Sequence, residues 1–135
     1  MNSGTSVDPA ETRPYYRLLG FCTQPDQPRG NSRIILKSRP DLENSRGDVH
    51  GGVVASMLDA AMGVALRSML PQGSNATTVS LTVNYLEPGR ETLIATGKVV
   101  RSGKTLASIE ATMEDSSGRA VAHALGTMRI LVPRP

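Results

Sequence analysis

A chain of 135 residues is long enough for one domain with a single core and too short for two. It has three Tyr, one Phe and no Trp, so aliphatic side chains, Met and Ala must fill the core. A thin core of this kind often gains burial by self-association. The formal net charge is +3, with Lys and Arg scattered along the chain, which argues against a nucleic-acid partner and suits a small anionic ligand better.

Cys22 is the only cysteine, which excludes an intrachain disulfide and a Cys-rich zinc site and favours a reducing compartment. The first residues lack the cationic start and the apolar core of a signal peptide, and no run of about 18 apolar residues occurs. We therefore expect a cytoplasmic protein with no membrane partner, and nothing in the sequence requires a metal or a cofactor.

The chain begins with a polar segment that contains Gly and Pro. We expect residues 1–13 to form a flexible tail and residues 14–135 to form a single domain. Pro14 to Leu19 is compatible with a short helix or turn, residues 24–31 with a loop, and the apolar run 33–37 with a strand.

The region from Gly51 to about Met69 is predicted to be the one long helix, because its apolar side chains recur at steps of three and four residues. These are Val54, Met57, Leu58, Ala61, Ala65 and Met69. Pro71 and Gly73 end the pattern. Between His50 and Leu66 the only charged residue is Asp59, so we expect the helix to be buried nearly all round.

The second half of the chain has the pattern of β-strands. Residues 78–85 alternate strictly, with Val79, Leu81, Val83 and Tyr85 on one face. Further strands are predicted over residues 92–101, 104–114 and 119–131, joined by short turns at Pro88-Gly89, Ser102-Gly103 and Ser116-Gly118. Short connections mean an antiparallel sheet, and with one apolar helix they predict an α+β fold in which about five strands wrap the helix.

Asp59 is the first candidate for chemistry, because a lone carboxylate on an apolar helix needs a reason. It lies away from the centre of the apolar face, and its neighbours on the helix include the small residues Ala55, Ser56 and Gly63. Small neighbours let a ligand or another backbone approach. From the residues alone, a structural hydrogen bond to a neighbouring strand is the more common reason for such an acid.

The helix start is the second candidate. Gly51 and Gly52 stand where backbone N–H groups have no partner inside the helix and where the dipole is positive, which suits a phosphate or a developing oxyanion. Two glycines also allow a sharp entry or close packing, and both interpretations remain open. His50 at this position is more often a local hydrogen-bonding group than a base.

Asp59 and Gly51 cannot meet within one chain. Asp59 lies eight residues after Gly51, about 12 Å along the axis at about 1.5 Å per residue. If both act on one carbonyl carbon, a second copy of the helix must run alongside in the opposite direction. The hypothesis therefore requires a homodimer with two shared sites.

Three segments together resemble those of the hotdog-fold acyl-CoA thioesterases of the phenylacetate-degradation (PaaI-like) type. They are Asn44…His50-Gly51-Gly52…Asp59, Thr78-Val-Ser-Leu-Thr-Val-Asn-Tyr-Leu-Glu-Pro88 and Ser102-Gly-Lys-Thr-Leu106. The resemblance extends over residues 15–132. It implies one helix wrapped by a five- or six-stranded antiparallel sheet, a dimer that often pairs into a dimer of dimers, and hydrolysis of an acyl-CoA thioester to an acid and CoA.

The same resemblance implies roles for individual residues. Asp59 would be the nucleophile or the general base for water, and Gly51 would give an oxyanion N–H. Asn44 would contact the thioester or the water, and His50 would help to shape the site. Thr78 would position the water. Gly52 would belong to the same substrate-binding turn.

Two further groups are candidates for substrate contacts. Arg101 and Lys104 flank the Ser-Gly hairpin and could hold the CoA phosphates, with Arg46 and Arg90 as other candidates, although each of these charges is more often simply solvated. The acyl group would lie near the dimer seam. Met62 is expected to line its pocket with Met57 and Val54, and Met adapts to varied shapes.

Other functions remain open at this point. A non-catalytic acyl-CoA binding or sensing module would keep the same pocket. No helix-turn-helix segment is attached that could report such binding to DNA, which weakens this alternative. A hotdog-type hydratase of enoyl thioesters is less compatible, because its His and carboxylate motifs do not occur here. The acyl group, the pathway, and the choice between direct attack by Asp59 and activation of water are not determined by the sequence.

Overall fold

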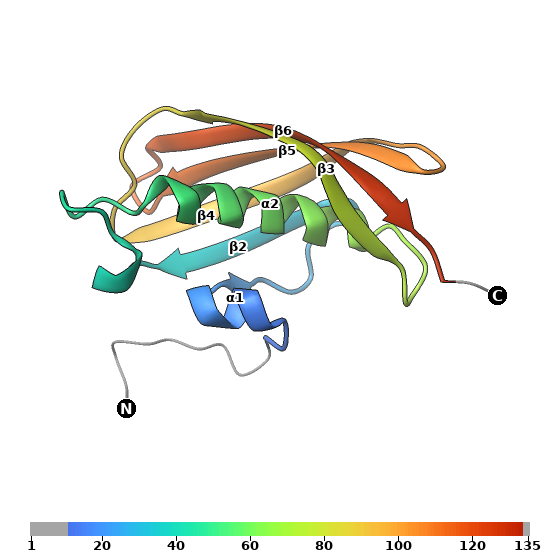
Figure 1. The fold of residues 1–135 in the computed structure, drawn as a ribbon, viewed down its shortest axis with the longest axis horizontal. Helices are drawn as coiled ribbons and strands as arrows, with labels where there is room; N and C mark the ends of the chain where they lie inside the picture. Colours follow the sequence, from blue (N-terminus) through green and yellow to red (C-terminus); the bar gives the residue numbers. More distant parts are fainter. Residues whose placement is uncertain (1–10, 134–135) are drawn as a thin grey trace.

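The computed structural model describes residues 11–133 and forms one sheet around one long helix (Figure 1). The elements in chain order are α1 (Pro14–Leu19), β1 (Cys22–Thr23), β2 (Asn31–Lys37), the 3-10 helix η1 (Pro40–Leu42), α2 (Gly51–Arg67), β3 (Asn75–Tyr85), β4 (Thr92–Ser102), β5 (Leu106–Asp115) and β6 (Ala120–Leu131). The six strands pair in the order β1-β2-β4-β5-β6-β3, and every pair is antiparallel. The predicted α+β architecture is confirmed.

The core lies between α2 and the inner face of the sheet. Helix α2 contributes nine buried residues, among them Met57, Leu58 and Leu66, and packs against all five longer strands. The helix approaches the sheet closely at Gly97 of β4, where a Cβ atom would collide with the carbonyl oxygen of Ala61. Ser32 of β2 donates a hydrogen bond of 2.5 Å to that oxygen. The small residues of α2 and β4 therefore let the sheet close tightly on the helix.

The sequence predicted that helix α2 is buried nearly all round, and nine of its 17 residues are buried in the single chain. Gly52 is exposed, and Ala55, Ser56 and Asp59 are only partly buried, so one narrow strip of the helix remains accessible in the single chain. The helix is as apolar as the sequence indicated, but the sheet covers only part of its surface. Helix α1 borders the strip, where Tyr15 and Ser56 share a hydrogen bond of 2.9 Å between their hydroxyl groups.

Strand β3 forms one edge of the sheet, and its alternation is interrupted. A β-bulge between Thr78 and Ser80 shifts the register with β6, so Leu81 and Val83 face the core while Val79 is exposed. The expectation that Val79 shares a face with Leu81 is wrong, because the extra residue in the bulge reverses the sides. As a result Thr78 points toward α2.

The remaining differences are at element ends. The long helix ends at Arg67 rather than near Met69, and the short β1 was not predicted from the sequence. Of the expected tail, residues 1–10 lie outside the described residues. Glu11 is buried, its carboxylate accepts a hydrogen bond of 3.2 Å from the hydroxyl of Thr23, and its carbonyl oxygen accepts one of 2.9 Å from Nη1 of Arg17, so the end of the expected tail contacts the domain.

Candidate active site

The first turn of α2 is closed by His50. Its Nδ1 accepts a hydrogen bond of 2.8 Å from the N–H of Gly52, which makes His50 the N-cap of the helix. The N–H of Gly52 is therefore engaged within the chain. The N–H of Gly51 has no acceptor among residues 11–133, so it is the donor at this helix start that is left for a ligand.

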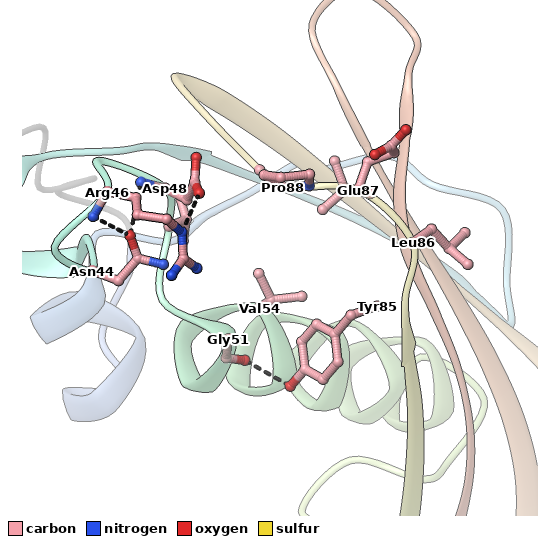
Figure 2. Close-up of a pocket in the computed structure, with 12 residues that line it drawn as sticks. Asn44, Arg46, Asp48, Gly51, Val54, Tyr85, Leu86, Glu87 and Pro88 are labelled. Carbon is pink, nitrogen blue, oxygen red and sulfur yellow. Dashed lines mark hydrogen bonds and ion pairs between the residues drawn. The ribbon is translucent and has the colours of Figure 1, made fainter.

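Tyr85 lies against the same turn and was not predicted as a site residue. Its hydroxyl donates a hydrogen bond of 2.8 Å to the carbonyl oxygen of Gly51 (Figure 2). A Cβ atom at Gly51 would lie 3.4 Å from Cε1 of the ring, which is van der Waals contact, so the ring packs directly on this turn. The signal was present in the sequence: Tyr85 ends a strand directly before the Leu-Glu-Pro turn, in a chain with few aromatic residues.

Asn44 is held by the loop that precedes α2. Its Oδ1 accepts hydrogen bonds from the backbone N–H groups of Arg46, at 2.9 Å, and Asp48, at 3.1 Å. These bonds form the turn of residues 44–48 and fix the side-chain amide. Its Nδ2 group has no acceptor among the described residues and remains free to donate.

A pocket of about 310 Å³ lies between this loop, the start of α2 and the turn after β3 (Figure 2). One side is polar and the other is largely apolar. Its lining comprises Asn44, Arg46, Asp48, Val49, Gly51, Val54, Tyr85, Leu86, Glu87, Pro88, Gly89 and Val121. The free donors of Asn44 and Gly51 thus share one cavity, as the resemblance implied for these two residues.

Asp48 connects the loop before α2 to the segment between β3 and β4. Its buried carboxylate forms ion pairs with Nε of Arg90 at 2.5 Å and with Nε of Arg46 at 3.4 Å. The hydrogen bond from Arg90 is the main reason that the pKa of Asp48 lies below its ordinary value, with a smaller contribution from Arg46. The backbone N–H of Val49 also donates to the carbonyl of Gly89, at 2.8 Å. Sequence reasoning missed Asp48, because its partner is 42 residues away.

Asp59 lies on the accessible strip of α2 and meets Thr78 of β3. The hydroxyl of Thr78 donates a hydrogen bond of 2.6 Å to Oδ1 of Asp59. This contact is the kind of structural hydrogen bond to a neighbouring strand that most often explains such an acid. It leaves Oδ2 of the carboxylate without a partner among the described residues. Asp59 does not line the pocket that contains Gly51, so one chain does not bring the two together.

The other expected substrate contacts lie elsewhere. Met62 is completely buried, and its sulfur lies beside Gly126 of β6, so it packs the core and does not line the pocket. Arg101 and Lys104 are exposed at the turn between β4 and β5. Ser102 pairs with Ala107, Ala107 pairs with Met128, and Met128 pairs with Thr78. This row across the sheet places the turn between β4 and β5 at the same end as Asp59, away from Gly51.

Residues 11–133 contain no group of three or more His, Cys, Asp or Glu side chains that could hold a metal ion. Within the same range, no helix is both long and apolar enough to span a lipid bilayer.

Comparison with known proteins identifies the family. The model of the thioesterase superfamily matches residues 46–122, which is more than half of the chain and includes Gly51, Asp59 and Thr78. The chain belongs to the thioesterase superfamily. The predicted hotdog fold, the resemblance to hotdog thioesterases of the PaaI-like type and the assignment as a thioester hydrolase are thereby confirmed.

Individual relatives agree with this assignment. A Halobacterium salinarum protein named "Putative esterase" is 37% identical over 124 residues, covering 84% of this chain and 82% of that protein. Human acyl-coenzyme A thioesterase 13 is 27% identical, over 89% of this chain and 87% of its own. The crystal structure of the BH2602 protein from Bacillus halodurans with CoA has a TM-score of 0.83 and 29% identity, over 93% of this chain and 83% of that one.

Proposed function

We propose that this protein hydrolyses acyl-CoA thioesters to the free acid and CoA, in sites shared by two copies of the chain. The observation that carries the proposal is that helix α2 presents two reactive groups: a free Gly51 N–H at its start and the Asp59 carboxylate on its accessible strip. The names of two relatives support the substrate class. One is an acyl-CoA thioesterase, and the structure of another contains CoA.

The separation of Gly51 and Asp59 supports a dimer. Their spacing along α2 is about 12 Å, so a complete site needs an antiparallel partner helix. If Gly51 of one helix lies beside the partner's Asp59, the two-fold axis passes near Ala55, midway between them. Gly52, Ala55 and Ser56 are small and only partly covered, which allows two helices to approach closely there. The second hydrogen-bonding edge of β3 has no partner strand within residues 11–133, and a copy of β3 would occupy it.

The chemistry follows from the polar groups. The thioester carbonyl oxygen accepts from the Gly51 N–H and from Nδ2 of Asn44, which stabilise the negative charge that develops on it. The partner's Asp59 takes a proton from water while the water oxygen attacks the carbonyl carbon. Alternatively, Asp59 attacks that carbon itself, and water then hydrolyses the mixed anhydride that forms, which releases the acid and restores the carboxylate. In both routes the C–S bond breaks after the attack, and the CoA thiolate leaves and is protonated. Thiolate is a good leaving group, so one carboxylate and an oxyanion site suffice.

The other residues have supporting roles in this proposal. His50 caps the helix and keeps Gly52 engaged, which leaves Gly51 as the donor. Thr78 fixes one oxygen of Asp59, so the second oxygen faces the water. The apolar side of the pocket, with Val54, Leu86 and Val121, receives the acyl group. Arg101 and Lys104 lie at the Asp59 end of the sheet, where the CoA phosphates of a shared substrate would extend.

The first test is hydrolysis of a panel of aryl-CoA and fatty acyl-CoA esters, followed with a thiol-trapping dye. Asp59→Asn should lower kcat by about a hundredfold or more, which is the usual cost of losing a base or an oxyanion donor. Gly51→Pro should do the same, because Pro is accepted at the first position of a helix but has no N–H. His50 has φ −58° and ψ 139°, a conformation that is compatible with a following Pro.

Mixing these two variants tests the shared site. A dimer with one Asp59→Asn chain and one Gly51→Pro chain has one site with both wild-type groups and one site with neither. Refolding the two inactive proteins together should therefore restore about a quarter of the wild-type activity, because half of the dimers are mixed and each has one site. Recovery of no activity from well-folded mixed dimers would reject the shared site. Tight binding of acyl-CoA without turnover would instead favour a binding module.

A further inference from the structure

Arg46 has an unusual position for a surface arginine. It stands between Asn44 and Asp48 in the turn before α2 and lines the pocket together with Gly51. Figure 2 shows it on the same wall as Asn44 and Asp48, across the pocket from Tyr85 and Leu86. Neither Nη1 nor Nη2 of Arg46 has an acceptor among the described residues. Three sets of free donors, from Gly51, Asn44 and Arg46, therefore line one cavity.

The charge of Arg46 is not neutralised by its neighbour. Asp48 contacts Arg90 at 2.5 Å and Arg46 at 3.4 Å, so the carboxylate is matched mainly by Arg90. Glu43 also acts on Arg90, whereas Asp48, at 3.4 Å, is the one carboxylate that forms an ion pair with Arg46 among the described residues. Glu87 also lines the pocket, but its carboxylate points away from Arg46 in Figure 2.

Asp48 also determines which part of Arg46 is available. Because Asp48 contacts Nε, the Nη side of the guanidinium is left for another acceptor. Arg90, in the segment between β3 and β4, also donates a hydrogen bond to Asp48, so the carboxylate that contacts Arg46 is itself anchored. The remaining donors of a guanidinium form a planar fork that matches a carboxylate or an oxyanion.

We propose that Arg46 is a catalytic residue of this site, which donates to the oxyanion of the reacting thioester and then to the carboxylate of the acid product. The assignment rests on the proposed thioester hydrolysis. The C–S bond breaks as described above, and Arg46 gives up no proton, because a guanidinium stays charged at neutral pH. Its contribution is greatest when the carbonyl oxygen is negative, so it lowers the barrier more than it strengthens substrate binding.

The test compares Arg46→Gln and Arg46→Lys with the wild type, and Arg129→Gln serves as a matched control. Arg129 is exposed on β6 and is not among the residues that line this pocket. The side chain of Arg46 is 74% exposed, so its replacement leaves the fold intact. Titration calorimetry measures binding of phenylacetate and of phenylacetamide, which have the same shape but differ in charge. Kinetics on the best acyl-CoA of the panel give kcat and KM.

The wild type is expected to bind phenylacetate at least tenfold more tightly than phenylacetamide, since a charge-assisted hydrogen bond is worth about 10- to 100-fold in affinity. Arg46→Gln should abolish that preference, leave phenylacetamide binding unchanged, and lower kcat about tenfold with little change in KM. Arg46→Lys should retain part of both, because it keeps the charge but loses the fork of donors. Arg129→Gln should match the wild type.

The results separate this assignment from the general function. A wild type without preference for the acid, or an Arg46→Gln protein that keeps both the preference and kcat within twofold, overturns the role of Arg46 even if hydrolysis is confirmed. Equal loss of acid and amide binding overturns it too, since it indicates damage to the pocket. Loss of the acid preference in Arg46→Gln, in a wild type that hydrolyses no ester, supports the anion site and rejects the hydrolase.

Discussion

The hydroxyl of Thr78 lies 2.6 Å from Oδ1 of Asp59, although the two residues are 19 positions apart and belong to a strand and a helix. The contact exists because the β-bulge beside Val79 turns Thr78 toward α2. It leaves the second carboxylate oxygen without a partner among the described residues, and in the proposed shared site that oxygen would act on a thioester held by the other chain. The hydrogen bond would therefore fix the direction of the carboxylate on which the proposed hydrolysis depends.

Replacing Thr78 separates this positioning from packing. Thr78→Val keeps the shape of the side chain but removes the donor, so kcat should fall about tenfold while KM changes little. Thr78→Ser keeps the hydroxyl and should retain most of the activity. Steady-state kinetics on the preferred acyl-CoA measure both, with circular dichroism to check the fold. A Thr78→Val enzyme with unchanged kcat would assign the contact a purely structural role.

Tyr85 should affect the site through Gly51. Tyr85→Phe removes only the hydrogen bond to the Gly51 carbonyl, and we expect a loss of about 0.5 to 1.5 kcal/mol in the free energy of unfolding and a modest fall in kcat. Tyr85→Ala also removes the ring that packs on Gly51, and its kcat/KM should fall further. Urea unfolding and kinetics distinguish the two effects. Identical kinetics for Tyr85→Ala and the wild type would show that the ring is not part of the site.

Gly97 should be the least replaceable glycine of the core. A methyl group there meets the backbone carbonyl of Ala61 and Oγ of Ser32, and neither can move without shifting α2. Gly97→Ala should therefore lower the free energy of unfolding by about 1 to 3 kcal/mol or more. Gly126→Ala is the matched control, because its methyl group meets mainly the flexible end of Met62, 2.9 Å away. Thermal unfolding should show the larger loss for Gly97→Ala.

Asp48 should make the protein sensitive to acid. Its folded-state pKa lies below the ordinary value of 3.8, mainly because of the hydrogen bond from Arg90. A lowered folded pKa means that the stabilisation is fully present above the unfolded value and is lost as the pH falls through the folded value. Unfolding temperatures measured between pH 7 and pH 3 should fall at the acid end for the wild type.

The Asp48→Asn variant isolates that contribution. Its unfolding temperature should be lower than that of the wild type at pH 7 and should change less toward pH 3, because the variant has no carboxylate to protonate at this position. Glu11 and Asp115 also have lowered pKa values, through Arg13 and Ser117 respectively, so some acid sensitivity remains in the variant. Parallel curves for the two proteins would show that the ion pairs of Asp48 do not stabilise the fold.

The local pattern of the sequence was sufficient for the main elements. The apolar spacing from Gly51 to about Met69 predicted α2, two residues too long, and the run of strands after it predicted the antiparallel sheet. The His-Gly-Gly turn and the lone Asp59 identified the two ends of the proposed chemistry, and the distance between them along one helix indicated a dimer. These features depend on residues a few positions apart, where the geometry of a helix or strand applies directly.

The tertiary structure decided the contacts that depend on strand register and loop closure. The bulge in β3 reversed the sides of Val79 and Thr78, and strict alternation in the sequence could not reveal an extra residue. The burial of Asp48 against Arg90, the ring of Tyr85 on Gly51 and the position of Met62 in the core likewise join segments far apart in the chain. Such contacts follow from how the sheet closes around α2, which no short stretch of sequence specifies.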